Sequence, residues 1–287
     1  MHIRRLSGNP IIRPKMDERL GNNINGPSLI KVPPWISKPL GKYYLYFAHH
    51  HGTYIRLAYS NSLEGPWNIY SPGVLDLKET GFDDHIASPD VRVIESRQEI
   101  RMYYHGSSPA FPHQITRVAV SRDGLHFESL VNDLGPAYFR TFVWKDDTYA
   151  LAMPGIFLRS RDGLHSFQEG PRLFTDHMRH SALDIEGHVL RVYFTNAGDC
   201  PESILLTMID LEKDWMEWRC SEPVLVLQPE MDFEGARLPL LPSKRDIAPE
   251  PVNQLRDPCI FKEDRKTYLL YAVAGERGIA IAEILEM

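Results

Sequence analysis

Ser121-Arg-Asp-Gly-Leu-His126 recurs in the chain as Ser160-Arg-Asp-Gly-Leu-His165, and a phenylalanine follows each copy closely. The Asp-Gly pair in each copy is typical of a turn between two β-strands. A sequence repeat of about 40 residues is typical of propellers and solenoids, in which each repeat forms one small supersecondary unit. The recurrence therefore predicts a fold assembled from similar β-units.

A longer pattern surrounds this repeat and occurs five times along the chain. Each unit starts with a short apolar strand, continues through a turn into a tyrosine-rich strand, and ends with a third and a fourth strand. The second strands are the clearest, because they consist mainly of the β-branched and aromatic residues that favour β-structure. They are expected at residues 43–48, 100–105, 149–153, 190–195 and 268–274.

The N-terminal stretch 5–14 has the character of the fourth strand that the fifth unit lacks. It contains Gly8-Asn-Pro-Ile-Ile-Arg-Pro14, which is similar to Glu222-Pro-Val-Leu-Val-Leu-Gln-Pro229 in the fourth unit. A strand from one end of the chain that completes the last blade removes an exposed sheet edge. We therefore predict an all-β fold, a five-bladed β-propeller whose N-terminal strand closes the last blade. Two β-sandwiches are the alternative, because strand patterning alone does not separate the two.

The five units divide residues 1–287 into blades of a single domain. The blades are expected at about 26–74, 87–134, 139–173, 180–228 and 256–287, the last completed by 3–14. Residues 229–255 form an unusually long, proline-containing stretch between two blades. We expect this stretch to cover one mouth of the propeller as a lid.

The composition narrows the classes of partner. The chain has 287 residues, 43% hydrophobic and 24% charged, which is enough for a full hydrophobic core. The net charge of −6 and the lack of a long Lys/Arg run argue against a nucleic acid or an anionic membrane as partner. The three cysteines lie far apart, which predicts neither a disulfide framework nor a zinc cluster. No signal-peptide pattern starts the chain and no apolar run is long enough to span a bilayer, so we expect a cytoplasmic protein.

Most of the histidines and several acids fall on segments that share one face of the predicted propeller. These segments are the connections between blades and the turns that join second to third strands. Their chemistry-bearing residues are His49, His50, His51, Asp83, Asp84, His85, His105, His113, Arg140, His177, His180, Asn196, Asp199, Glu234, Arg256, Asp257 and Glu276. Because carboxylates accept hydrogen bonds from hydroxyl groups and Arg and His donate them, this mouth favours a small carbohydrate as ligand.

Metal binding by the same residues is an alternative with weak support, because no spacing such as His-x-x-x-His fixes a ligand geometry, and we assign no metal ligands among them. The three consecutive histidines His49, His50 and His51 would alternate sides on a strand, so at most two of them can face the same way. We expect no cofactor, although the architecture leaves room for a structural metal ion in the central channel.

Two motifs resemble those of known enzymes. The segment Arg256-Asp-Pro-Cys-Ile-Phe-Lys-Glu-Asp-Arg-Lys-Thr-Tyr-Leu-Leu-Tyr271 resembles the blade-opening motif of the five-bladed propeller glycoside hydrolases of families 43, 32 and 68. Ala87-Ser-Pro-Asp90-Val, followed by Ile100-Arg-Met-Tyr-Tyr104, is similar to the Ala-Pro-Asp blade of family 43. The resemblance covers essentially the whole chain as architecture. It implies a glycosidase that cleaves a small oligosaccharide or glycoside by carboxylate acid/base chemistry at the propeller mouth.

The resemblance also implies roles for individual acids. Asp257 matches the acid that stabilises the transition state or tunes the pKa of the general acid, and Asp90 matches an acid that lines the site. Glu234, in Phe233-Glu-Gly-Ala236, resembles the motif that carries the general acid. The predicted catalytic residues are Asp90, Glu234, Asp257 and Glu276, and the predicted substrate-binding residues are Asn25, His50, His85, His105, Arg140, His180 and Arg256.

The chain departs from the family pattern at two places. The first blade opens with Ile24-Asn25-Gly26-Pro27-Ser28, where the family places an aspartate as base or nucleophile, and Glu234 precedes the Arg-Asp-Pro blade. A sugar-binding propeller without catalysis is therefore one alternative. A glycoside phosphorylase is another, with Arg140 and the histidines holding phosphate. A protein-interaction scaffold is the third, although a scaffold has no need of a mouth lined by His, Asp and Glu.

Overall fold

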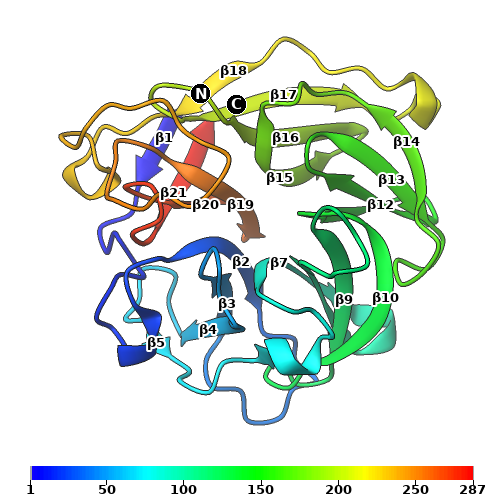
Figure 1. Cartoon of the computed structure of the whole chain (residues 1–287), viewed down its shortest axis with the longest axis horizontal. Helices are drawn as coiled ribbons and strands as arrows, with labels where there is room; N and C mark the ends of the chain where they lie inside the picture. The colour runs from blue at the N-terminus through cyan, green and yellow to red at the C-terminus, as the bar shows by residue number, and fades with distance from the viewer. Residues whose placement is uncertain (1, 287) are drawn as a thin grey trace.

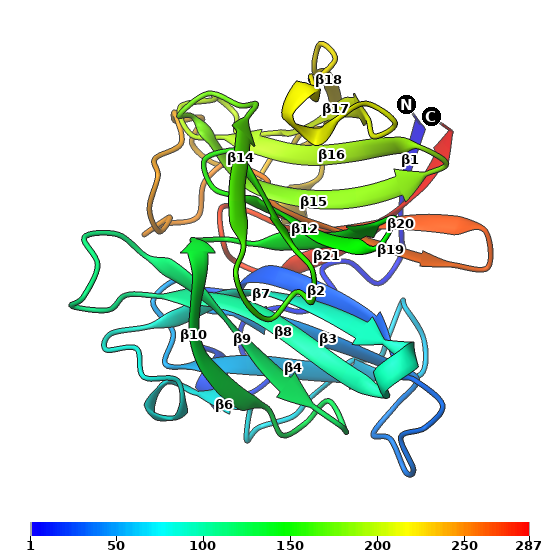
Figure 2. The same cartoon turned by 90° about the vertical axis from the view of Figure 1, so that its right-hand side faces the viewer.

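Five antiparallel sheets surround a central axis in the computed structural model, which describes residues 2–286 (Figure 1). The first blade contains β2 (Asn25–Lys31), β3 (Tyr43–Ala48), β4 (Tyr54–Ser60), β5 (Asn68–Ile69) and β6 (Leu75–Asp76). The second contains β7 (Ile86–Ile94), β8 (Glu99–Gly106), β9 (Ile115–Ser121) and β10 (Glu128–Pro136), which lie side by side in Figure 2. The third contains β11 (Arg140–Trp144), β12 (Asp147–Ala152), β13 (Ile156–Ser160) and β14 (Gln168–Arg172).

The remaining blades come from the last part of the chain and its start. The fourth contains β15 (Met178–Glu186), β16 (Val189–Asn196), β17 (Ile204–Asp210) and β18 (Val224–Leu227). The fifth contains β19 (Arg256–Glu263), β20 (Lys266–Ala272), β21 (Ile279–Glu286) and β1 (His2–Arg5). Short 3-10 turns lie at η1 (Glu18–Leu20), η2 (Leu77–Glu79), η3 (Glu95–Arg97), η4 (Trp215–Glu217) and η5 (Asp232–Glu234). Among residues 2–286, no helical turn has the length and apolar character that a membrane-spanning helix needs.

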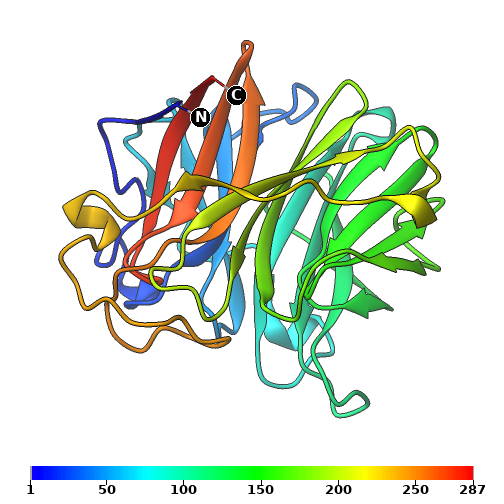
Figure 3. The same cartoon turned by 90° about the horizontal axis from the view of Figure 1, so that it is seen from above.

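The N-terminal strand closes the ring. Strand β1 pairs antiparallel with β21, and the two chain ends lie next to each other (Figure 3). The pairing continues beyond the strand, because the Leu6 amide donates to the Ile281 carbonyl and Ile12 forms a bridge with Ile279. The predicted five-bladed propeller and its closure are therefore confirmed. The closing strand β1 covers only His2–Arg5, so it begins one residue before the expected stretch 3–14 and ends well before that stretch does.

The opening sequence repeat joins adjacent blades. In the first copy the Gly124 carbonyl accepts a hydrogen bond of 2.9 Å from Tyr46 on β3 of the preceding blade. In the second copy the Gly163 carbonyl accepts one of 2.9 Å from Tyr103 on β8 of its own preceding blade. The hydrophobic core follows the same plan, since each of its clusters contains residues of two neighbouring blades. The repeat thus sets how one blade packs on the next.

Four of the inner strands are irregular at the blade openings. The ladder register shifts in β2, β7, β15 and β19 near their first residues. At three of these shifts a residue adopts a left-handed backbone, with φ of 60° at Gly26, 49° at Ser88 and 50° at Asp257. A bulge turns the affected side chain in a new direction, and a non-glycine residue in this conformation stores strain. The strain at Ser88 and Asp257 marks the mouth of the propeller as the place to look for a site.

Candidate functional site

A cavity of about 590 Å³ lies where the inner strands begin. Six of the predicted site residues line it: Asn25, His50, His85, His105, His180 and Asp257. The other predicted site residues are not on its wall: Asp90, Arg140, Glu234, Arg256 and Glu276. The structure therefore gathers the predicted histidines around one of the four predicted catalytic acids.

Asp257 occupies the strained position at the opening of β19 and is only 1% exposed. Tyr138 donates a hydrogen bond of 2.7 Å to its Oδ1, and His180 Nε2 lies 3.5 Å from the same oxygen. Its Oδ2 has no hydrogen-bond partner among the described residues. Burial, and next the negative charge of Glu276, raise the pKa of Asp257. Because burial favours the protonated form of this carboxyl group, and one of its oxygens is uncommitted on a cavity wall, Asp257 is suited to donate a proton to a bound molecule.

Tyr138 connects this carboxyl group to the rest of the cavity. Its ring lies between those of His180 and His105, with centroid separations of 5.2 and 6.0 Å. The guanidinium of Arg140 stacks on the tyrosine at 4.0 Å from the ring centroid, while its Nε donates to the Ser181 carbonyl at 3.0 Å. Arg140 therefore supports Tyr138 and does not reach the cavity wall itself. The strand pattern missed Tyr138 because it lies outside β11, in the connection before that strand.

The buried histidines of the cavity are neutral. Burial, more than any neighbouring charge, lowers the pKa of His105 and His180 far below the usual value, and it lowers the pKa of His85 as well. Neutral imidazole both donates and accepts hydrogen bonds. The Nδ1 atom of His105 has no partner among the described residues, and neither has the Oδ1 atom of Asn25. These atoms are available to ligand hydroxyl groups, which fits the predicted carbohydrate site.

Asp90 faces the central channel two residues deeper along its strand than Ser88 and lies beside a small void below the cavity. Its Oδ2 accepts hydrogen bonds from the backbone amide and the hydroxyl group of Thr141, at 2.9 and 2.8 Å. Its Oδ1 pairs with Arg92 at 2.9 Å. The carboxylate thereby ties the second blade to the third, which is a structural position rather than one on the cavity wall.

Glu234 is completely buried away from the cavity, in the turn η5. It accepts hydrogen bonds of 2.7 and 3.0 Å from Arg5, the last residue of β1, and one of 2.7 Å from Tyr271 on β20. The backbone amides of Glu230 and Met231 also donate to it at 2.9 Å. The carboxylate therefore joins the closing strand, the fifth blade and the long segment 229–255, and it does not reach the cavity as a general acid would have to.

Glu276 and Arg256 form a buried pair behind the cavity wall, 2.8 Å apart. Arg256 also lies 3.2 Å from the buried Glu202. Glu276 Oε1 lies 3.0 Å from Nδ1 of His50, so this carboxylate orients a histidine that does line the cavity. Burial opposes ionisation of Glu276, but the hydrogen bond and charge of His50 and the charge of Arg256 outweigh it and lower its pKa. Glu276 and Arg256 therefore do not line the cavity themselves, but they hold His50, which does, in its orientation.

The long segment 229–255 supplies residues that the sequence pattern did not single out. It crosses in front of the fifth blade in Figure 1, and its Arg245 and Asp246 line the cavity together with Arg179 of β15. The Nε atom of Arg179 is buried and has no partner among the described residues. A run of charged residues, Lys244-Arg245-Asp246, inside a proline-containing stretch was the available signal. The segment therefore forms part of the cavity wall.

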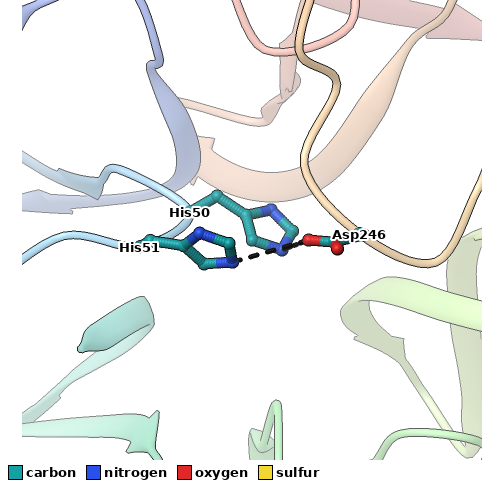
Figure 4. Close-up of side chains that lie close together, drawn as sticks. All are labelled: His50, His51 and Asp246. Carbon is teal, nitrogen blue, oxygen red and sulfur yellow. Dashed lines mark ion pairs between the residues drawn. The ribbon is translucent and has the colours of Figure 1, made fainter. Parts of the chain in front are cut away.

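His50 and His51 both line the cavity, although neighbours on a strand would point to opposite sides. Strand β3 ends at Ala48, so these histidines lie in a turn and strand alternation does not apply. Figure 4 shows both rings directed at Asp246, whose Oδ1 lies 3.6 Å from His50 Nε2 and 3.4 Å from His51 Nε2. These three side chains form the group at the cavity that could hold a metal ion.

Solved structures show the same fold with little sequence identity. A family 43 β-xylosidase/α-arabinofuranosidase from a compost metagenome, in complex with xylotriose, matches with a TM-score of 0.68 at 13% identity, over 100% of this chain and 96% of its own. The GH43_1 enzyme of Xanthomonas citri, complexed with xylose, matches with a TM-score of 0.64 at 9% identity, over 98% and 93%. A putative glycosidase of Bacteroides thetaiotaomicron gives 0.68 at 14% identity, over 97% and 96%. The chain therefore has the fold of the family 43 five-bladed propellers.

Sequence comparison identifies a relative. No protein-family model matches the chain. Uncharacterized protein R118 of Acanthamoeba polyphaga mimivirus is 36% identical over 297 residues, which cover 91% of this chain and 83% of the relative. Identity at that level over nearly the full length means that the two chains descend from one ancestor and share the propeller. The protein thus belongs to the family of mimivirus protein R118, a family with the architecture of the family 43 glycoside hydrolases.

Proposed function

We propose that this protein cleaves a glycosidic bond in a small oligosaccharide or glycoside, with Asp257 as the general acid. One observation carries the proposal: the buried carboxyl group of Asp257 lines the cavity, has a raised pKa and leaves Oδ2 without a partner among the described residues. The cavity volume of about 590 Å³ is in the range of sites for small molecules. Two structural neighbours hold xylotriose and xylose, so pentose-containing substrates are the first to test.

In the proposed hydrolysis, Asp257 gives its proton to the glycosidic oxygen while the bond from that oxygen to the anomeric carbon breaks. Water adds to the anomeric carbon and gives its proton to the neutral imidazole of His105, whose Nδ1 has no partner among the described residues. His105 then releases this proton to solvent and Asp257 recovers one, so that both groups return to their starting protonation states. Tyr138 holds the carboxyl group in place through Oδ1, which leaves Oδ2 for the reaction.

The test is release of reducing sugar from a panel of aryl glycosides and oligosaccharides, with the purified protein and its Asp257→Asn variant assayed together. The proposal expects release by the wild type and little by the variant. Binding of the same sugars without any release, equal in both proteins, would identify a sugar-binding propeller and contradict the proposed enzyme.

The pH profile gives a second prediction. A general acid works only while protonated, so kcat/KM falls as pH rises through the raised pKa of Asp257. The Tyr138→Phe variant loses the hydrogen bond that stabilises the carboxylate, which moves this fall to higher pH. Measured profiles of wild type and variant check the shift. An unchanged profile, or one moved to lower pH, would show that Asp257 is not the titrating acid.

Phosphorolysis is a second candidate, because the other three predicted catalytic acids are absent from the cavity wall. Phosphate can attack the anomeric carbon itself, so this reaction needs no base. Arg179 and Arg245 line the cavity and could hold the phosphate, whereas Arg140 is not on the cavity wall. The panel is therefore run with and without inorganic phosphate. Release that needs phosphate, with a sugar phosphate as product, identifies a phosphorylase, and equal release without it identifies a hydrolase.

A further inference from the structure

We propose that His50, His51 and Asp246 bind a divalent metal ion such as zinc at the wall of the cavity. The three side chains point toward one another, from the turn after β3 and from the segment 229–255 (Figure 4). Asp246 Oδ1 lies 3.6 Å from Nε2 of His50 and 3.4 Å from Nε2 of His51. The candidate ligand atoms all lie within 4.8 Å of one another. Of the three, only His50 has a role above, as a predicted substrate-binding residue.

The two separations between Asp246 and the histidines fit a tetrahedral ion. Zinc binds imidazole nitrogen at about 2.0–2.1 Å and carboxylate oxygen at about 2.0–2.2 Å, which places neighbouring ligand atoms about 3.3–3.5 Å apart. The observed distances of 3.4 and 3.6 Å are close to this range, and a small rotation of one side chain would bring both within it. Two imidazole ligands also select the class of metal, because calcium and magnesium prefer oxygen ligands and imidazole suits zinc, cobalt and nickel.

His50 has the outer-shell partner that metal-bound histidines usually have. Its Nδ1 lies 3.0 Å from the buried carboxylate of Glu276, which Arg256 and Asn23 hold in place by hydrogen bonds. A hydrogen bond from Nδ1–H to a carboxylate fixes the tautomer, so that Nε2 presents its lone pair. Nε2 is the atom that faces Asp246. The orientation of His50 by Glu276 is thus a second observation, separate from the proximity of the three side chains, which indicates that His50 binds a metal ion.

Asp246 is held in position by its main chain. Its carbonyl oxygen accepts a hydrogen bond of 3.0 Å from Arg256, and its carboxylate accepts one from the amide of Ile247. The ion would therefore connect the segment 229–255 to the first blade. Because His50, His51 and Asp246 all line the cavity, a fourth position left open by three protein ligands would face the substrate space. A water molecule or a sugar hydroxyl group fits that position.

Metal binding is measured on the full chain after treatment with a chelator. Co²⁺ is added while visible absorption is recorded, since a tetrahedral Co²⁺ site absorbs strongly, and Zn²⁺ is then added as competitor. We expect one Co²⁺ per chain, displaced by Zn²⁺, and a higher Tm of the wild type with Zn²⁺. The His51→Ala and Asp246→Asn variants should lose more affinity than the roughly 10–100-fold that loss of an outer-shell partner costs. Their side chains are 54% and 62% exposed, so both variants should fold.

Two controls separate this site from general metal binding by histidine. His113→Ala removes another exposed histidine of the same cavity and should leave Co²⁺ binding unchanged. His188→Ala removes the other His/Asp/Glu group among the described residues, His188 with Asp210 and Glu212, and should also have no effect. Absence of Co²⁺ binding, or binding that survives in both His51→Ala and Asp246→Asn, would overturn the proposal. None of these readouts depends on glycoside cleavage.

Discussion

The Asp257→Asn variant is expected to lose about 10²- to 10⁴-fold in kcat/KM on an oligosaccharide substrate. Asparagine has nearly the shape of aspartic acid but cannot transfer a proton to the glycosidic oxygen. The loss should be small for a dinitrophenyl glycoside, because that leaving group departs without protonation. Measuring both substrates with both proteins isolates proton donation from binding. Equal losses on the two substrates would contradict a role as general acid.

The Asp90→Asn variant is the matched control, since it makes the same change in another buried acid of an inner strand. Asp90 accepts hydrogen bonds from Thr141 and pairs with Arg92, so the free energy of unfolding should fall by about 1–3 kcal/mol. The activity of the folded protein should stay close to that of the wild type. If Asp90→Asn lowers kcat as much as Asp257→Asn does, the general acid is not a residue of the cavity wall.

The two variants should also differ in how pH affects stability. The pKa of Asp257 is higher in the folded protein than its unfolded value of about 3.9. Its contribution to the free energy of unfolding is therefore fully present at pH values below about 3.9. The contribution is lost as pH rises through the folded pKa. Asp257→Asn should remove this dependence and be at least as stable as the wild type at neutral pH. A lower Tm for Asp257→Asn at neutral pH would show that the carboxylate is charged and stabilising.

The Glu234→Gln variant is expected to unfold with about 3 kcal/mol less free energy than the wild type. Glu234 is completely buried, and its carboxylate binds Arg5, Tyr271 and two backbone amides. Glutamine leaves the guanidinium of Arg5 without its buried counter-charge and places an amide group where only hydrogen-bond donors converge. Urea unfolding followed by circular dichroism measures the difference. Because Arg5 is the last residue of the closing strand β1, the pairing of β1 with β21 should be the first part of the variant to open.

Glu230→Gln is the control for this prediction. Glu230 lies 3.1 Å from the same Arg5 but its side chain is 56% exposed, so its removal should cost no more than about 1 kcal/mol. The kcat of folded Glu234→Gln should match that of the wild type. A stable Glu234→Gln protein without activity would instead assign the general acid to Glu234, as the resemblance of its motif implies.

The fold could be predicted closely because its signal repeats. The second strand expected at 43–48 coincides with β3, and the strand expected at 100–105 differs from β8 by one residue at each end. Each blade repeats the same order of turn and aromatic strand, so an error in one unit is corrected by the others. The closing strand has no such support, and β1 ends at Arg5, well before the end of the expected stretch 3–14.

The location of the site at one mouth of the propeller could be predicted from the sequence, but the residues that line it could be predicted only in part. Strand order puts the blade openings at one mouth, and this brought Asp257 and the histidines together as expected. Whether an acid reaches the cavity depends on a bulge or on a distant partner, which periodicity does not reveal. Asp257 is turned by the bulge at the opening of β19, whereas Glu234 is held away by Arg5, 229 positions earlier in the chain. Tyr138 and Asp246 lie in irregular connections, where no strand pattern places a side chain.

The most direct test of the central claim is a crystal structure of the Asp257→Asn variant with an oligosaccharide of the assay panel. We expect the sugar in the cavity, with its glycosidic oxygen within hydrogen-bond distance of residue 257 and its hydroxyl groups on His180 and Asn25. A sugar bound outside the cavity, or inside it with the glycosidic oxygen facing away from residue 257, would contradict the account.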